Sequence, residues 1–302
     1  MKDDNSPICP SFFVLGTQKS GTSTLHNWLN QNSNISLPTL KETHFFSDEL
    51  NFQKGLCWYN SWFSTGHNKI RVEIDPSYIY VKDSAARLRE TVNPAPAFII
   101  IFRDPLKRAY SHYRMSVQRG LESLRYIDAL QAEKKRLAKD KDKFSFLNHS
   151  YISRGSYSNQ LQHYLKIFPD SKFLYLKFDE FYESSTRRSM YSKVCDFMSV
   201  PLETPNVNLD IISRPASTSR FMWLSRFMHR KSRFKDVVGR LIPSDKFRAN
   251  LFNFIDESNK TPTIEKDKFN KSDLPQNLLD WANHEIELLS KLTNLDLTEW
   301  LN

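Results

Sequence analysis

Short apolar runs alternate along the chain with amphipathic stretches of helical period. Four runs have the length of strands, at 11–15, 71–74, 97–102 and 172–178. The run at 97–102, AFIIIF, is apolar throughout, which indicates a strand buried on both faces. Apolar residues at helical spacing follow these runs at 22–30, 106–119, 184–198 and 278–292. This alternation predicts βαβ units, and therefore an α/β fold with a central parallel β-sheet flanked by helices.

A parallel sheet has chemical consequences, because the carboxyl ends of its strands meet at one edge. Ligands of such folds bind beyond these carboxyl ends. We therefore expect the loops that follow Leu15, Ile74 and Phe102 to share one crevice.

The first of these loops reads GTQKSGTST and has the character of a phosphate-binding loop. Gly16 and Gly21 have the spacing of a P-loop, G-x-x-x-x-G-K-[ST], but Thr22 stands where that pattern has lysine. The lysine lies inside the loop, as Lys19. A helix beginning here would direct amides and hydroxyls of Ser20, Gly21, Thr22, Ser23 and Thr24 at an anion. An internal lysine suits a leaving phosphate at the inner end of the anion. A glycine- and serine-rich turn without ligand is the alternative.

A second anion-binding segment follows the apolar run at 97–102. Arg103 comes directly after the strand, and Ser111 lies eight residues later in the next predicted helix. The planar guanidinium of arginine binds phosphate in a bidentate manner. Two phosphate sites on one sheet edge suggest a nucleotide with phosphates at both ends of its ribose. An ion pair between Arg103 and Asp104 is the simpler alternative.

Composition narrows the class of protein. The 302 residues carry a formal net charge of +9, which favours an anionic partner without identifying it. The three cysteines are far apart and lack the spacing of a zinc finger. Such a set is typical of reduced thiols in a reducing compartment. The N-terminal residues contain no apolar signal core, and no run approaches the length of a membrane-spanning helix. We therefore expect a soluble, cytoplasmic protein.

We expect a single domain over 1–302, with 1–10 flexible and 120–150 a charged helical insertion. The high density of charged residues in 122–143 indicates a solvated helix and loop. The stretch from Arg220 to Arg248 carries nine Lys or Arg and two Asp, with apolar residues near helical spacing. It fits an ordinary basic amphipathic helix, an anion-binding surface or peripheral contact with a membrane.

Four segments together resemble a known family. TQKSGTSTL, KETHFFS, RDPLKRAYSHY and RGSYSNQLQHYLKIFP occur in the order seen in sulfotransferases that use 3′-phosphoadenosine 5′-phosphosulfate, above all carbohydrate sulfotransferases of the heparan sulfate type and their bacterial relatives. The resemblance runs from about Phe12 to the C-terminus. It implies a P-loop-NTPase-like three-layer fold, the phosphosulfate donor with adenosine 3′,5′-bisphosphate as product, and no metal.

The resemblance also implies roles for individual residues. The segment from Lys19 to Thr24 matches the loop for the 5′-phosphosulfate, with Lys19 at the leaving phosphate, and Arg103 and Ser111 match the 3′-phosphate pair. Tyr157 lies in a segment near the nucleotide, and Arg220 lies in a loop that grips it. In KETHFFS, Glu42 takes the place of the general base, which accepts the proton of the attacking hydroxyl or amine. Lys41 and His44 flank it and are expected to bind the acceptor or balance charge at the sulfuryl group, with a purely structural histidine as the alternative for His44.

Two other functional classes are open at this point. A P-loop phosphotransferase would need the lysine after Gly21 that this chain lacks. A non-catalytic binder of acidic polysaccharide would rest on the net charge and the basic stretch alone. The resemblance favours a carbohydrate or glycolipid acceptor and no nucleic acid.

Overall fold

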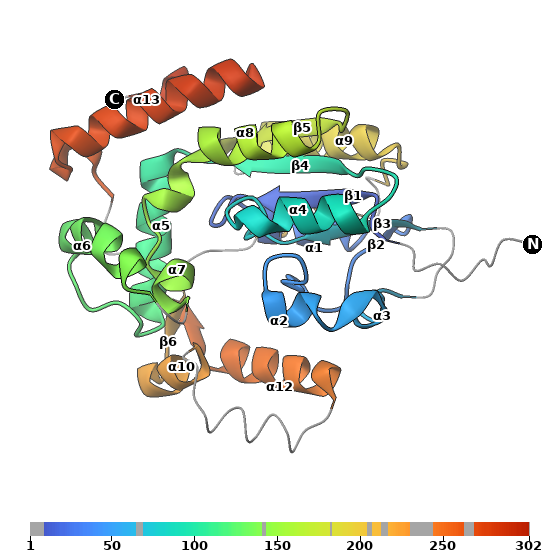
Figure 1. Ribbon diagram of the computed structural model, residues 1–302, viewed down its shortest axis with the longest axis horizontal. Helices are drawn as coiled ribbons and strands as arrows, with labels where there is room; N and C mark the ends of the chain where they lie inside the picture. Colours follow the sequence, from blue (N-terminus) through green and yellow to red (C-terminus); the bar gives the residue numbers. More distant parts are fainter. Residues whose placement is uncertain are drawn as a thin grey trace, which may run out of the picture. The chain divides into compact units, whose positions relative to one another are not determined.

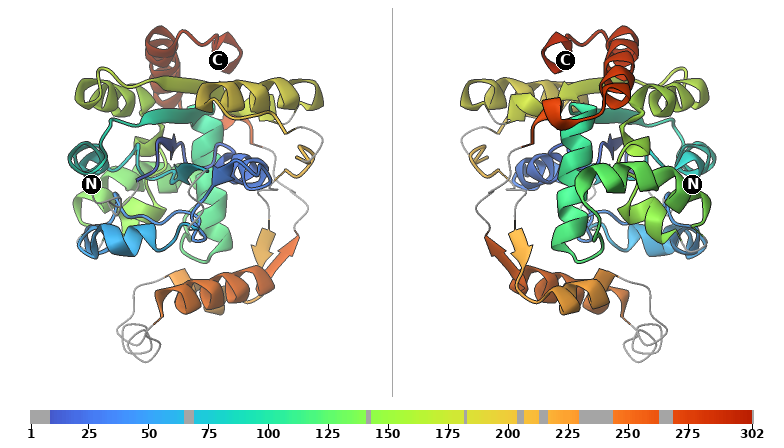
Figure 2. Two further views of the ribbon diagram at one scale, coloured as in Figure 1. Left: turned by 90° about the vertical axis from the view of Figure 1, so that its right-hand side faces the viewer. Right: turned by 90° about the vertical axis from the view of Figure 1, so that its left-hand side faces the viewer.

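The computed structural model describes residues 9–64, 69–140, 143–181, 183–203, 207–212, 217–229, 244–262 and 269–301 (Figure 1, Figure 2). The chain divides into two compact units. The sheet unit comprises residues up to 104, 156–213 and 284–301, and the helical unit comprises 105–155 and 214–283. The predicted flexible segment 1–10 lies almost wholly outside the described residues.

The sheet unit is built around a parallel sheet of strand order β2-β3-β1-β4-β5 within the described residues. Its strands are β1 (Phe12–Gly16), β2 (Ile35–Ser36), β3 (Ile70–Ile74), β4 (Ala97–Phe102) and β5 (Phe173–Lys177). All four neighbouring pairs are parallel, which confirms the predicted sheet. The carboxyl ends of β3, β1 and β4 therefore lie side by side at one edge.

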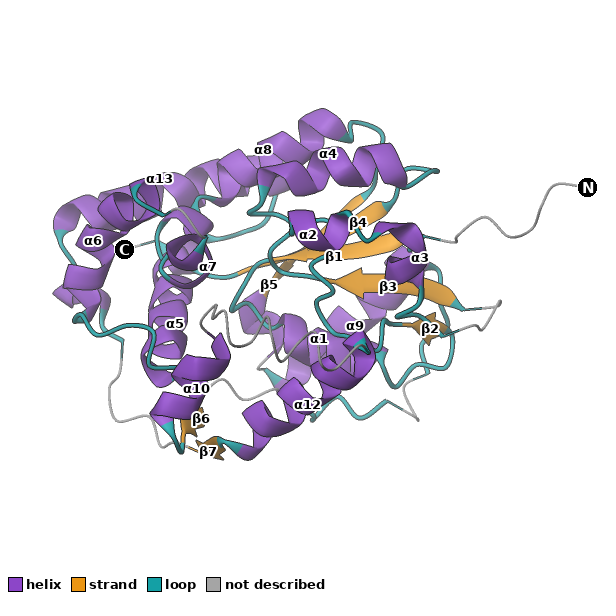
Figure 3. Cartoon of the chain, turned by 60° about the horizontal axis from the view of Figure 1, so that its bottom comes forward, coloured by secondary structure: helices purple, strands orange, loops and turns teal. Residues whose placement is uncertain are grey.

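Helices cover both faces of this sheet (Figure 3). They are α1 (Thr22–Leu29), α2 (Glu49–Phe52), α3 (Gly55–Asn60), α4 (Lys82–Thr91), α8 (Tyr157–Ile167) and α9 (Ser184–Met198), joined by the C-terminal part of α13 (Gln276–Thr293) and by short 3₁₀ turns at Phe178–Phe181 and Thr298–Trp300. Alternate residues of β1 separate the two faces. Phe13 and Leu15 pack with α4 and α8, whereas Val14 packs with α1 and α9. The result is the three-layer arrangement that the sequence predicts.

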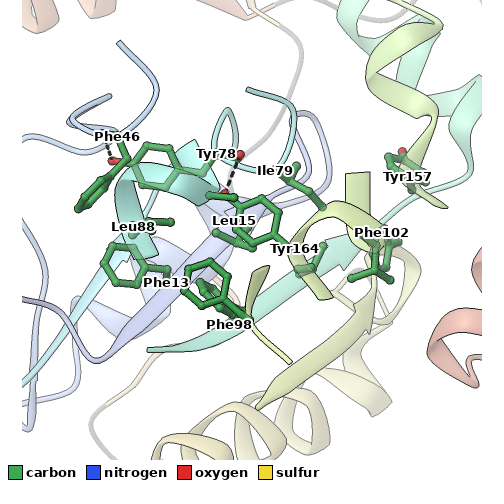
Figure 4. Packing of buried hydrophobic residues seen from close by; sticks show 14 of the residues in the cluster. Phe13, Leu15, Phe46, Tyr78, Ile79, Leu88, Phe98, Phe102, Tyr157 and Tyr164 are labelled. Carbon is green, nitrogen blue, oxygen red and sulfur yellow. Dashed lines mark hydrogen bonds between the residues drawn. The ribbon is translucent and has the colours of Figure 1, made fainter. Parts of the chain in front are cut away.

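The first face carries an aromatic core (Figure 4). Phe46 lies edge to face with Phe13, at 5.7 Å between ring centroids, and with Tyr78. The Phe13 ring is tilted against the rings of Tyr78 and Phe98. The Tyr164 hydroxyl donates a 2.8 Å hydrogen bond to the Tyr78 carbonyl. Edge-to-face pairs add about 0.5–1.5 kcal/mol each beyond the burial of their area. This core fixes the segments that leave the carboxyl edge of the sheet.

The helical unit consists of α5 (Pro105–Gln118), α6 (Tyr126–Ala138), α7 (Phe144–Asn148), α10 (Met222–His229), α12 (Asp245–Ser258) and the N-terminal part of α13, with 3₁₀ turns at Ser153–Gly155 and Lys271–Asp273. Two short strands, β6 (Ser217–Ser219) and β7 (Lys260–Pro262), pair antiparallel.

One face of the charged helix α6 is buried, although the sequence predicts a solvated helix. Ala129 and Leu130 enter the apolar cluster of the helical unit, and Glu133 is buried. The Glu133 carboxylate accepts hydrogen bonds from the backbone amides of Ile152 (2.6 Å) and Ser153 (2.9 Å). A buried carboxylate is tolerated because these amides satisfy it.

Candidate active site

The loop between β1 and α1 has an unusual backbone. Gly16, Lys19 and Gly21 have φ angles of 143°, 71° and 87°. A Cβ atom at Gly21 would lie 3.4 Å from the Phe178 ring, so the loop packs closely on the turn after β5. Thr17 fastens the loop to β4, because its amide and its hydroxyl donate to the Ile101 carbonyl at 2.9 and 3.1 Å. The loop is thus held rigidly at the edge of the sheet.

The N-terminus of α1 lacks a counter-charge of its own. Its N-cap residue is Gly21, which offers no capping side chain, and its first turn contains no acidic residue. A helix leaves its first amides without intrahelical partners and carries a partial positive charge at this end. The hydroxyls of Ser20, Thr22 and Ser23 belong to the same segment. These residues fit an anion such as a phosphate group.

Gly16 is expected to be required for this loop. A Cβ atom there would come within 3.0 Å of the Pro76 carbonyl oxygen, at a φ angle that L residues rarely adopt. Gly16→Ala should therefore lower the free energy of unfolding by about 2–3 kcal/mol. Gly55→Ala is the matched control, since its φ is 78° but nothing lies within 4 Å of the added atom. Urea unfolding that shows equal losses for the two variants would contradict the predicted clash.

Arg103 closes the loop from the end of β4. Its Nη1 atom donates a 2.9 Å hydrogen bond to the Lys19 carbonyl, and its guanidinium lies 4.1 Å from the centroid of the Phe178 ring. The Tyr157 hydroxyl donates to the Arg103 carbonyl at 3.0 Å. Tyr157 itself is buried in the aromatic core. The structure therefore brings Arg103 and Lys19 together, and places Tyr157 behind Arg103 as a support for its backbone.

A second segment, Lys41 to His44, reaches the start of α1. The Lys41 ammonium group donates to the Ser23 hydroxyl at 2.5 Å and lies 3.3 Å from a carboxylate oxygen of Glu42. One lysine side chain thus links Glu42 to the first turn of α1. The Glu42 side chain is 31% exposed, and Glu42 and His44 have φ angles of 63° and 52°. The Glu42 carboxylate is therefore accessible to a ligand from solution.

Asp75, directly after β3, holds the other end of this segment. Its carboxylate accepts the His44 amide at 2.9 Å and faces the His44 Nδ1 atom at 2.8 Å. Burial lowers the pKa of His44, but the charges of Asp75 and Glu42 raise it more, to about 9. The imidazole is therefore protonated at neutral pH and suits charge balance rather than proton acceptance.

This pair predicts a pH-dependent contribution to stability. Because the pKa of His44 is raised in the folded state, its stabilisation is complete below its ordinary value of about 6.5 and is lost as the pH rises through about 9. The difference in unfolding free energy between wild type and His44→Gln should be largest near pH 6 and should shrink above about pH 9. Urea unfolding of both proteins across this range measures it. A difference that stays constant with pH would contradict the assignment.

Beneath this segment lies a buried carboxylate, Glu73 of β3. It accepts hydrogen bonds from the hydroxyls of Thr43, Tyr59 and Tyr78. Burial is the main cause that raises the pKa of Glu73 to about 7, and the charge of Asp75 adds to it. The neighbouring Phe46 is buried, and its amide donates to the Tyr78 hydroxyl at 3.3 Å. The hydrogen bonds to Glu73 and Asp75 therefore fasten residues 43–46 to β3.

The structure thus gathers Lys19, Ser20, Gly21, Thr22, Ser23, Thr24, Lys41, Glu42, His44 and Arg103 at the carboxyl edge of the sheet unit. Ser111, on α5, and Arg220, before α10, belong to the helical unit. Their part in nucleotide binding stays a prediction.

Asp75 and Glu73 were not predicted from the sequence as partners of residues 41–44. A signal existed for both, because Glu73 places a carboxylate between the apolar residues Val72 and Ile74 of β3, and Asp75 follows directly at the carboxyl end of this strand. Thr17, which fastens the loop, had no distinguishing signal.

The described residues contain neither a candidate metal centre nor a candidate membrane span. Among them, no group of three or more His, Cys, Asp or Glu is placed to hold a metal ion. No helix in the described part of the chain has the length and apolarity needed to cross a membrane.

Comparison with known proteins adds independent findings. Residues 10–233 match the sulfotransferase domain family. The chain is 34% identical over 113 residues to the membrane-associated sulfotransferase kil1 of Dictyostelium discoideum, covering 36% of this chain and 23% of that protein. It is 28% identical over 180 residues to human heparan sulfate glucosamine 3-O-sulfotransferase 3A1, covering 58% of this chain and 41% of that protein. The chain therefore spans less than half the length of these relatives.

The fold also matches a solved structure over nearly its whole length. A sulfotransferase from Alicyclobacillus acidocaldarius superposes with a TM-score of 0.65 at 20% identity, covering 97% of this chain and 98% of that one. At this level of identity the match supports the fold alone.

Proposed function

The chain belongs to the sulfotransferase domain family, a family of transferases, and from this we propose that it moves a sulfuryl group from 3′-phosphoadenosine 5′-phosphosulfate to a hydroxyl or amine of a carbohydrate acceptor. Membership of this family supports the reaction class. The donor, the acceptor and the residue roles that follow are our proposal.

One observation carries the proposal. The Lys41 side chain contacts both the Ser23 hydroxyl and the Glu42 carboxylate, at 2.5 and 3.3 Å. A group able to accept a proton is thereby linked to a helix end able to hold a phosphate. A transfer from a phosphate-linked donor to a hydroxyl needs these two functions in one place.

Each group of residues would bind a different part of the donor. The amides at the start of α1 and the hydroxyls of Ser20, Thr22, Ser23 and Thr24 would hold the 5′-phosphosulfate. Lys19 would stabilise the negative charge that develops on the leaving phosphate oxygen. Arg103 would bind the 3′-phosphate, with Ser111 as its partner and Tyr157 holding its backbone. Arg220 would contribute a further contact to the nucleotide.

Glu42 would accept the proton of the acceptor hydroxyl or amine as that atom bonds to sulfur, in line with the departing phosphate oxygen. Lys41 and the protonated His44 would balance the charge of the sulfuryl group and bind the acceptor. No metal ion is required in this scheme, because cationic side chains and helix amides carry the electrostatic stabilisation.

Relatives that sulfate heparan support a carbohydrate acceptor for this chain, which spans only part of their length. The direct test is a transfer assay with the labelled donor in the presence of a chelator. The panel contains a glucosamine polysaccharide, neutral oligosaccharides, a glycolipid and a simple phenol. We expect label in one of the carbohydrate acceptors. Transfer to the phenol alone would overturn the acceptor class, and no transfer to any acceptor would overturn the proposed function.

A further inference from the structure

The helical unit exposes large apolar side chains on α10. Trp223 is 69% exposed, and Phe227, one turn later on the same face, is 41% exposed. The opposite face of α10 is packed, because Ser225 and Met228 are buried. The helix therefore turns its aromatic residues away from the unit to which it is attached.

Helix α12 repeats this arrangement. Phe247, Leu251 and Phe254 are all exposed, and their spacing of four and three residues places them on one face of the helix. Phe254 is 71% exposed. In an amphipathic helix of a soluble domain this stripe would face the core. Here it is turned to solvent.

The two helices form one connected structure (Figure 3). Asn259, just after α12, accepts the Phe221 amide at 2.8 Å through its side chain and the Arg220 amide at 2.7 Å through its carbonyl. Its side-chain amide donates back to the Phe221 carbonyl at 3.1 Å. Strands β6 and β7 pair next to this contact. The exposed aromatic residues are therefore presented by an ordered element.

Positive charge is concentrated in the same segment. Residues 220–248 hold nine Lys or Arg and two Asp, a net charge of +7 out of the +9 of the whole chain. Arg226 is exposed on α10 between Trp223 and Phe227. Five of the nine cations belong to residues 230–243, which lie outside the described residues.

We propose that the surface formed by Met222, Trp223, Phe227, Phe247, Leu251 and Phe254 docks on an anionic lipid membrane. Basic helices with Trp, Phe and Leu on their other face bind in the interfacial region of bilayers, where the aromatic rings enter and the cations meet lipid headgroups. A second copy of the chain fits poorly, because both surfaces carry the same positive charge. A soluble polyanion would contact the cations but would not cover the exposed apolar side chains.

Co-sedimentation of the full chain with vesicles tests this proposal. We expect binding to phosphatidylcholine vesicles that contain phosphatidylglycerol, and little binding to phosphatidylcholine alone. The double variant Trp223→Ser with Phe254→Ser should bind the anionic vesicles about tenfold more weakly, and Arg226→Glu should also weaken binding. The matched control is Leu50→Ser with Ile211→Ser, two exposed apolar residues of the sheet unit, which should bind as wild type does.

Two outcomes would overturn the proposal. One is absence of wild-type binding to the anionic vesicles. The other is equal binding by wild type and the Trp223→Ser, Phe254→Ser variant, which would identify a purely electrostatic surface suited to soluble polyanions. Quenching of tryptophan fluorescence by brominated lipid tests the same insertion with the variant Trp223→Phe, which keeps an apolar aromatic side chain at this position. It should be strong in wild type and clearly reduced in Trp223→Phe, and unchanged quenching in that variant would also overturn insertion of Trp223.

Discussion

Replacement of Glu42 by glutamine is expected to reduce the rate of sulfuryl transfer by about 10²–10⁴-fold while leaving the affinity for adenosine 3′,5′-bisphosphate unchanged. Glutamine has the size of glutamate but cannot accept the proton that the acceptor must lose. The Glu42 carboxylate lies outside the loop that would hold the nucleotide, and Lys41 connects it to Ser23. Loss of turnover should therefore appear without loss of nucleotide binding.

Glu90→Gln is the matched control for this substitution. Glu90 lies exposed on α4 in the same unit, so the same chemical change there should leave both transfer and binding as in wild type. Transfer rates with the labelled donor and calorimetric titration with the bisphosphate provide the two readouts. Full turnover by Glu42→Gln would remove Glu42 as the general base.

Replacement of Lys19 by alanine should have the second largest effect. A charge-assisted contact to phosphate contributes about 1.5–3 kcal/mol, so the bisphosphate should bind roughly ten- to a hundredfold more weakly. Turnover should fall by about 10²–10³-fold as well, because the charge that develops on the leaving oxygen loses its counter-ion. Lys19→Ala thus affects binding and rate together, whereas Glu42→Gln affects rate alone.

Lys82→Ala, at an exposed position at the start of α4, is the control for loss of one positive charge from the sheet unit. It should change the affinity by less than about twofold. If Lys19→Ala binds the bisphosphate as tightly as wild type does, the loop after β1 does not hold the phosphate as we propose.

The regular parts of the fold were predictable because their burial is written into the residue pattern. The apolar run of β4 and the helical period of α9 end where the sequence places them, at Ala97–Phe102 and Ser184–Met198. Helix α4 could not be assigned in this way. Its buried residues are Ser84, Ala85 and Leu88, and two small side chains give almost no apolar periodicity.

The residues proposed for the site were predictable in type, and the backbone conformation that presents them was not. A glycine in the sequence can indicate a left-handed backbone. Lys19, Glu42 and His44 adopt positive φ angles without this signal. Tertiary contacts impose these angles, including the hydrogen bond of the His44 amide to Asp75. Only the folded chain reveals that Asp75 orients the segment containing Glu42.

The measurement closest to the central claim is a calorimetric titration of the wild-type chain with adenosine 3′,5′-bisphosphate and with ADP, in the presence of a chelator. A site built from Lys19, the start of α1 and Arg103 should bind the bisphosphate at least about tenfold more tightly than ADP, and Arg103→Ala should abolish most of that preference. Equal affinity for the two nucleotides would contradict the account.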